Sequence, residues 1–154
     1  MIALADGMPV WYMKQATLFF LHPHSYGVIM KTCIDVDALG KGGPYSHSVK
    51  ANGFVFVSGN VAIDPESGEQ VRGDIPKATR IILKNIETIL KAAGSDLSKA
   101  VKTTVFLTDM GNFPVMNEAY KEFFPKDPPA RSCVAVKQLP MDFDIEIELI
   151  ALAE

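Results

Sequence analysis

Cysteine and histidine are scarce in this sequence. The 154 residues include three histidines and two cysteines, Cys33 and Cys133, which lie a hundred positions apart. Neither a disulfide framework nor the paired cysteines of a structural zinc site can be built from this set. A chain of this length forms a hydrophobic core large enough to fold without such a staple. This usage is typical of a reducing compartment, so we expect a cytoplasmic protein.

Arginine is also scarce, and positive charge does not dominate the sequence. Only three of the fifteen Lys and Arg residues are Arg, and the eighteen Asp and Glu residues bring the formal net charge to −3. Binding to a phosphate backbone requires a face rich in Lys and Arg, whereas the lysines here are interleaved with acids. Nucleic acid is therefore not expected to be the main partner.

Long apolar runs and the common catalytic motifs are absent. No run approaches the roughly 20 apolar residues that span a membrane, so an integral membrane protein is not expected. The sequence also lacks a P-loop, a GxGxxG fingerprint, a GxSxG elbow and an HExxH pair. These absences exclude the nucleotide-binding, hydrolase and metalloprotease classes that the motifs define, and we expect no metal site.

The first thirty residues differ in composition from the rest of the chain. They hold two charged residues, Asp6 and Lys14, against 31 in the following 124 positions. The apolar run 16–21 is shorter than the core of a secretory signal, and a mitochondrial presequence is normally rich in Arg, which this segment lacks. We interpret residues 1–29 as an extension outside a single domain of residues 30–154. Organelle targeting, with a mitochondrial location, is the alternative.

The domain begins with a predicted hairpin and a long helix. Asn52-Gly53 supplies the two positive-φ residues of a type I′ turn between strands at 46–50 and 54–58. Apolar residues then recur every three or four positions over residues 75–93, which predicts an amphipathic helix. Asp74 is the expected N-cap of that helix, and Gly94 is expected to end it.

The second half of the chain alternates strands with one more helix. We predict strands at 101–108, 131–137 and 143–149, and a helix at 113–124 with Asn112 as its cap. The resulting order is ββαβαββ. Two helices on one face of a mixed, mostly antiparallel sheet make an α+β sandwich of two layers. The second face of the sheet must then be covered or solvated.

A few polar residues are candidates for chemistry. Arg131 follows Pro128-Pro129-Ala130 and opens a strand, so rigid backbone directs a guanidinium that matches a carboxylate or phosphate. A structural salt bridge to an acid such as Glu146 is the alternative. His47 is expected to be a half-exposed structural residue, and Cys133 an inert, half-buried thiol. The acidic face of the last strand is expected to be a solvated edge.

Several segments resemble one family, the RidA (YjgF-type) reactive-intermediate deaminases. The resemblance covers about residues 30–154. The segments that carry it are Gly43-Pro44-Tyr45-Ser46, Phe56-Val57-Ser58-Gly59, residues 102–107, residues 117–124, Pro129-Ala130-Arg131-Ser132-Cys133-Val134, Leu139-Pro140 and Ile145-Glu146-Ile147-Glu148. One departure is Asn60, because the family often has Gln after the Ser-Gly pair. The shorter side chain changes the expected pocket shape and substrate range.

The resemblance implies a chorismate-mutase-like fold and a homotrimer with its active sites between subunits. It also implies hydrolysis of 2-imino and enamine acids to 2-oxo acids and ammonia without a metal or organic cofactor. Arg131 would bind the substrate carboxylate and Glu146 would position or activate the attacking water. The remaining pocket residues implied by the motifs are Tyr45, Ser58, Asn117 and Cys133. A protonated imine is already electrophilic, so this chemistry needs little beyond orientation, a placed water and proton transfer.

Two other functions are compatible with the same resemblance. Some family members have been described as endoribonucleases or translation inhibitors, which the acidic charge of this chain disfavours. A non-catalytic ligand-binding or chaperone-like module that uses the same cleft is the third possibility. RNA cleavage, or retention of 2-oxo acids without turnover, would distinguish these two from a deaminase.

Overall fold

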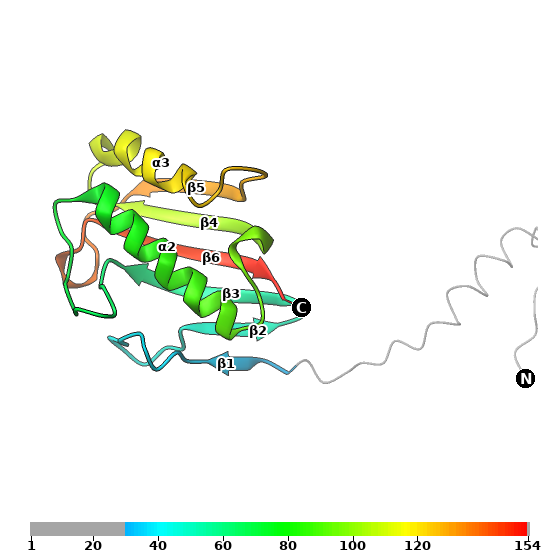
Figure 1. The fold of residues 1–154 in the computed structure, drawn as a ribbon. Helices are drawn as coiled ribbons and strands as arrows, with labels where there is room; N and C mark the ends of the chain where they lie inside the picture. The colour runs from blue at the N-terminus through cyan, green and yellow to red at the C-terminus, as the bar shows by residue number, and fades with distance from the viewer. Residues whose placement is uncertain (1–29, 154) are drawn as a thin grey trace, which may run out of the picture.

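The protein folds as a six-stranded sheet covered on one face by two helices (Figure 1). The structure is a computed structural model that describes residues 30–153. Its strands and helices are β1 (Thr32–Ile34), β2 (Ser48–Ala51), β3 (Phe54–Val61), α2 (Ile75–Ala92), β4 (Ala100–Leu107), α3 (Phe113–Lys121), β5 (Ala130–Ala135) and β6 (Ile145–Leu152). The predicted α+β sandwich of two layers is confirmed.

The sheet has the strand order β1-β2-β3-β6-β4-β5. β4 and β5 pair in parallel and α3 connects them, while all the other neighbouring strands pair antiparallel. The last strand, β6, is inserted between β3 and β4. Its acidic residues therefore lie in the middle of the sheet, and the prediction that they form a solvated edge is wrong.

The predicted elements are present with small shifts, and one strand was missed. β1 has three residues, too few to produce a readable alternation of apolar and polar positions. α3 ends at Lys121, three residues before the predicted end. Asn112 makes no side-chain capping bond. In the short turn before the helix, Asp109 accepts a hydrogen bond from the Gly111 N–H at 2.8 Å.

α2 forms where the sequence signals place it. The Asp74 carboxylate accepts a hydrogen bond from the Lys77 N–H at 3.0 Å, and Gly94 takes a positive φ of 72° after the last turn. Between these ends, Ile82, Ile86 and Ile89 are fully buried against the sheet. Each such side chain stabilises the fold by roughly 1.5–3 kcal/mol relative to exposure.

The two faces of the sheet differ in cover. Val55, Val105 and Ile147 are completely buried on the face beneath the helices. The alternate residues of each strand lie on the second face, which no described element covers. Phe54 and Phe56 remain exposed on this face, with their ring centroids 6.3 Å apart. We refer to this second face as the open face.

Candidate functional site

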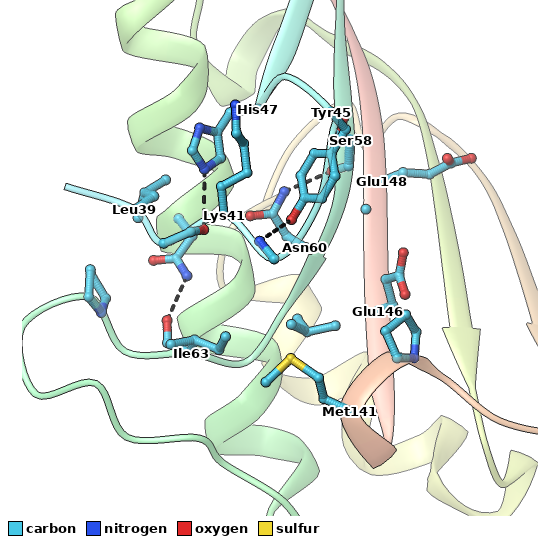
Figure 2. A pocket seen from close by; sticks show the side chains of 17 residues that line it. Leu39, Lys41, Tyr45, His47, Ser58, Asn60, Ile63, Met141, Glu146 and Glu148 are labelled. Carbon is cyan, nitrogen blue, oxygen red and sulfur yellow. Dashed lines mark hydrogen bonds between the residues drawn. The ribbon is translucent and has the colours of Figure 1, made fainter. Parts of the chain in front are cut away.

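A cavity of about 790 Å³ lies between β3 and the segment of residues 39–47 that precedes β2 (Figure 2). It forms where the β3–β6 pairing shifts register between Val57 and Asn60. Such a bulge bends a strand and redirects its side chains. Of the residues predicted for the site, Tyr45, Ser58 and Glu146 line this cavity.

Tyr45 and Ser58 are held in place by backbone groups. The Tyr45 hydroxyl accepts a hydrogen bond from the Gly42 N–H at 3.2 Å, and the Ser58 hydroxyl donates to the Ser46 carbonyl at 2.7 Å. Asn60 also lines the cavity, and its amide donates to the Ser58 carbonyl at 2.8 Å. These contacts join the end of β3 to the glycine-rich wall of the cavity.

The Glu146 carboxylate lies directly against the backbone of Gly59. A Cβ atom at position 59 would lie 1.8 Å from Glu146 Oε1, far inside van der Waals contact. Only glycine at this position leaves room for the carboxylate. Burial raises the pKa of Glu146 above its usual range, and the nearby negative charge of Glu148 raises it further. A carboxylate with a raised pKa in a cavity is suited to proton transfer.

The wall opposite β3 is fixed by His47 and Asp35. His47 is 6% exposed, and its Nδ1 accepts a hydrogen bond from the Val36 N–H at 3.1 Å. The expectation of a structural His47 is met, but the side chain is buried rather than half-exposed. Asp35 accepts from the His47 N–H at 3.0 Å and pairs with Lys41 at 2.7 Å. The Lys41 ammonium in the cavity wall is thus already paired with a carboxylate.

Arg131 occupies a different place, on the edge strand β5. Its guanidinium carbon lies 4.6 Å from the ring centroid of Tyr120 and 5.6 Å from that of Phe113. Among residues 30–153, no carboxylate or hydrogen-bond acceptor pairs with this guanidinium. The salt bridge to Glu146 is therefore not formed within the chain. Cation–π contacts fix the position of the group and leave its five N–H donors available.

Asn117 and Cys133 lie beside Arg131. Phe113, Asn117 and Tyr120 are spaced by four and three residues, which places them on one face of α3. Cys133 follows Arg131 by two residues and therefore points to the same side of β5. Burial raises the pKa of the Cys133 thiol, and the positive charge of Arg131 opposes the shift. The side chain is half-buried, as predicted, and its lack of reactivity stays a prediction.

The six predicted residues therefore fall into two groups of three. Tyr45, Ser58 and Glu146 form the first group at the cavity, and Asn117, Arg131 and Cys133 form the second on β5 and α3. Figure 1 shows β6 and β4 lying between β3 and β5. One chain does not bring the two groups together.

Four residues that lie next to the two groups were not predicted from the sequence. They are Gly59, Met141, Phe113 and Tyr120. Gly59 had a readable signal, since a glycine inside a strand pattern often marks a bulge or a close approach. Phe113 and Tyr120 fit the apolar stripe of α3, so a contact with a cation could not be distinguished from core packing.

Two further properties of the described part of the chain bear on the class of site. Residues 30–153 contain no group of three or more His, Cys, Asp or Glu side chains arranged to bind a metal ion. Within the same residues, no helix has both the length and the apolar character needed to cross a membrane.

One protein family matches most of the chain. The family described as Endoribonuclease L-PSP matches residues 35–153, which is most of the chain. The chain belongs to this family, which is the YjgF/RidA family.

Relatives of similar length carry different names. A RutC family protein of Pyrococcus horikoshii is 51% identical, over 73% of this chain and 89% of that protein. The human 2-iminobutanoate/2-iminopropanoate deaminase is 40% identical, over 81% of this chain and 91% of that protein. The mitochondrial protein mmf1 of Schizosaccharomyces pombe is 42% identical, over 91% of this chain and 85% of that protein.

Solved structures share the fold closely. A putative endoribonuclease of Thermotoga maritima superposes with a TM-score of 0.76 at 47% identity, over 81% of this chain and 99% of that one. The structure of Escherichia coli TdcF with bound serine gives a TM-score of 0.75 at 38% identity, over 80% and 99%.

Proposed function

We propose that this protein hydrolyses short-lived 2-imino and enamine acids, such as 2-iminobutanoate and 2-iminopropanoate, to 2-oxo acids and ammonia. The observation that carries the proposal is an unpaired, ring-stacked Arg131 together with Glu146, whose pKa is raised in a cavity. The names of the human relative and of the serine-bound Escherichia coli structure support a small substrate of the amino-acid type.

The chemistry needs one carboxylate that accepts and returns a proton. Glu146 takes a proton from water as the water oxygen attacks C2 of the protonated imine, and the C=N π electrons move to nitrogen. The protonated Glu146 then transfers its proton to the amine nitrogen of the carbinolamine. The C–N bond breaks and its electron pair leaves with ammonia, while the C2 hydroxyl gives its proton to Glu146 and becomes the carbonyl of the 2-oxo acid. Glu146 passes this proton to the departing ammonia, so ammonium leaves and the carboxylate is regenerated. No redox change occurs, so this mechanism requires no redox cofactor.

Arg131 binds the substrate carboxylate through two parallel N–H···O bonds in this proposal. Its planar guanidinium matches a carboxylate, and stacking on Tyr120 reduces the freedom of the side chain before the substrate arrives. Lys41 is a weaker candidate for this role, because it already pairs with Asp35 at 2.7 Å.

A complete site requires a second copy of the chain. Arg131, Asn117 and Cys133 of one copy would meet Tyr45, Ser58 and Glu146 of another, and three such contacts close a homotrimer. The open face supports this assembly, since Phe54, Phe56, Val134 and Leu152 are exposed on it. Phe54 and Leu152 are partners across β3 and β6, and exposed apolar neighbours of this kind mark protein interfaces.

The test is release of ammonia in a coupled assay. A threonine dehydratase generates 2-aminoacrylate or 2-iminobutanoate, and 2-oxo acid and ammonia are followed with and without the protein. We expect faster release in its presence, unchanged by chelators, from a particle with three times the mass of one chain. Unaltered release rates would reject the deaminase proposal, and RNA cleavage that stays with the purified particle would support a ribonuclease instead.

We propose a cytoplasmic location for the protein, as expected from its cysteine usage. The name of the Schizosaccharomyces pombe relative supports the mitochondrial alternative. Mass spectrometry of the natural N-terminus distinguishes the two, because removal of residues 1–29 would indicate import.

A further inference from the structure

Thr103 is a polar residue in an otherwise apolar row of β4. Val105 and Leu107, the next residues that face the helices, are completely buried, and Thr103 is buried to the same extent. Its hydroxyl lies 2.8 Å from the hydroxyl of Tyr120 on α3. A buried hydroxyl needs such a partner, whereas a valine at this position would need none. Core packing alone therefore does not require this polar pair.

Tyr120 connects Thr103 with Arg131. Arg131 is the register partner of Thr103 on β5, so the two side chains stand next to each other on the face beneath the helices. The Tyr120 hydroxyl contacts Thr103, and the Arg131 guanidinium carbon lies 4.6 Å from the centroid of the same ring. In Figure 1, α3 lies beside β5 at the end of the sheet that these strands form. One ring thus carries a hydrogen bond at its tip and a cation on its face.

The Tyr120 ring is held from more than one direction. It is buried, and the ring of Phe124 packs against it with a centroid distance of 4.7 Å. Apolar contacts of this kind are not directional, whereas a hydrogen bond is. The bond to Thr103 therefore specifies the angle of the ring relative to β4, which packing alone does not.

Tyr120 contacts Arg131 as a neutral ring and not as a counter-ion. Burial raises the pKa of Tyr120, and the Thr103 hydrogen bond and the positive charge of Arg131 oppose this shift only in part. The phenol therefore stays protonated at neutral pH. A neutral ring attracts a guanidinium through its π face and occupies none of its N–H donors.

We infer that Thr103 and Tyr120 are positioning residues for Arg131, and this inference rests on the proposed function. The hydrogen bond between them sets the angle of the ring, and the ring sets the plane of the guanidinium that binds the carboxylate of a 2-imino or 2-oxo acid. Two parallel hydrogen bonds to a carboxylate require that plane to be fixed, so fixing it in advance increases affinity. Neither hydroxyl contacts the substrate in this arrangement.

Two variants of Thr103 separate the hydroxyl from the shape of the side chain. Thr103→Val keeps the branched shape and removes the hydrogen bond, whereas Thr103→Ser keeps the hydroxyl and removes a buried methyl group. We expect Thr103→Val to raise both the Kd for 2-oxobutanoate, measured by calorimetry, and the KM for 2-iminobutanoate by about tenfold. Its kcat should stay within about twofold, because the carboxylate keeps the same charge in the transition state. Thr103→Ser should keep Kd and KM within about threefold of the unmodified protein.

Tyr120→Phe removes the other partner of the same hydrogen bond. It should raise Kd and KM by about tenfold as well. The double variant Thr103→Val/Tyr120→Phe should also show a rise of about tenfold, because the second change removes nothing that the first has left. A rise of about a hundredfold in the double variant would mean that the two hydroxyls act independently, and would overturn the coupling.

Thr79→Val is the matched control. Thr79 is also completely buried, and its hydroxyl donates to the Ile75 carbonyl at 2.7 Å within α2. This variant should lose thermal stability with Kd and KM unchanged, and sedimentation checks that every variant assembles as the unmodified protein does. An unchanged Kd and KM in Thr103→Val, or an equal rise in Thr103→Ser or Thr79→Val, would overturn the positioning role.

The two measurements also separate this inference from the proposed function. If the unmodified protein binds 2-oxobutanoate without hydrolysing the imine, the proposed function fails, and the Kd values of the variants alone decide the positioning role. If it neither binds the 2-oxo acid nor hydrolyses the imine, both fail.

Discussion

Arg131 and Glu146 lie on opposite faces of the same sheet. Arg131 pairs in register with Thr103, whose hydroxyl bonds to the Tyr120 hydroxyl at 2.8 Å beneath the helices. Glu146 pairs with Phe106, three positions along the same strand and therefore on the open face. If these two residues serve one reaction, as proposed, they come from two chains.

This separation makes subunit complementation the most direct prediction. Arg131→Ala and Glu146→Gln should each be nearly inactive, and co-refolding equal amounts of the two should restore activity. A complete site forms where an Arg131→Ala chain supplies Glu146 and a neighbouring Glu146→Gln chain supplies Arg131. Random mixing of equal amounts produces this arrangement at about one quarter of the subunit contacts. Ammonia release measures the recovery. A mixture that stays as inactive as its parents would show that the site lies within one chain.

Gly59 should control the position of the Glu146 carboxylate. Gly59→Ala forces the flexible end of Glu146 away from β3, because the new Cβ would lie 1.8 Å from Oε1. We expect kcat to fall by about 10- to 100-fold, within the range for loss of general acid–base catalysis, with little change in Tm. Gly40→Ala is the matched control, since a Cβ there meets nothing within 4 Å in the same cavity wall. Equal kcat values in the two variants would contradict the positioning role.

The fold was largely predictable from the sequence because its signals are local. The Asn52-Gly53 turn, the Asp74 cap and the 3.6-residue period of α2 each lie within a few residues. The strand order was not predictable, because it depends on which strands, distant in the sequence, form hydrogen bonds with each other. The insertion of β6 between β3 and β4 moved Glu146 from an assumed edge to the centre of the sheet.

The candidate site was predicted by residue type rather than by arrangement. The six residues were predicted from the motif resemblance alone. Their division between two faces of the sheet depends on the strand register, because a shift of one residue moves every side chain of a strand to the other face. The close contact of Gly59 with Glu146 depends on the register shift between β3 and β6, and this shift could not be predicted before the strand pairing was known. Met141, which has a φ of 56°, had no signal either, because its turn contains no glycine.

Glu148 should influence the pH dependence of the reaction. Its negative charge contributes to the raised pKa of Glu146, although burial is the larger cause. Glu148→Gln should therefore lower that pKa, and the acidic limb of kcat/KM, which reports ionisation of the base, should move to lower pH. Glu66→Gln, at an exposed turn outside the cavity, is the control. A limb that stays in place or moves to higher pH would contradict the assignment of Glu146 as the base.

Glu146 should also cost the protein stability while it is ionised. Its folded-state pKa is raised, so the folded protein binds the proton more tightly than the unfolded chain does. Stability is then gained as the pH falls through the folded-state pKa and lost as it rises. Glu146→Gln should show a higher Tm than the unmodified protein at pH 7 and almost no difference at pH 4. A lower Tm at pH 7 would indicate that the carboxylate makes a stabilising contact.

Replacement of Arg131 by lysine tests whether geometry or charge binds the carboxylate. An ammonium keeps the positive charge but cannot form two parallel hydrogen bonds or stack its plane on Tyr120. A charge-assisted pair lost in a desolvated cleft costs about 2–5 kcal/mol, so kcat/KM should fall by about 30- to 3,000-fold in Arg131→Lys. Arg80→Lys is the control, because Arg80 forms its two-bond pair with Glu122 at 2.8 and 2.6 Å, away from both groups of site residues. The assay is imine hydrolysis coupled to a dehydratase, with sedimentation to establish that both variants assemble. Turnover by Arg131→Lys within threefold of the unmodified protein would make this arginine structural, and the carboxylate would then need another ligand.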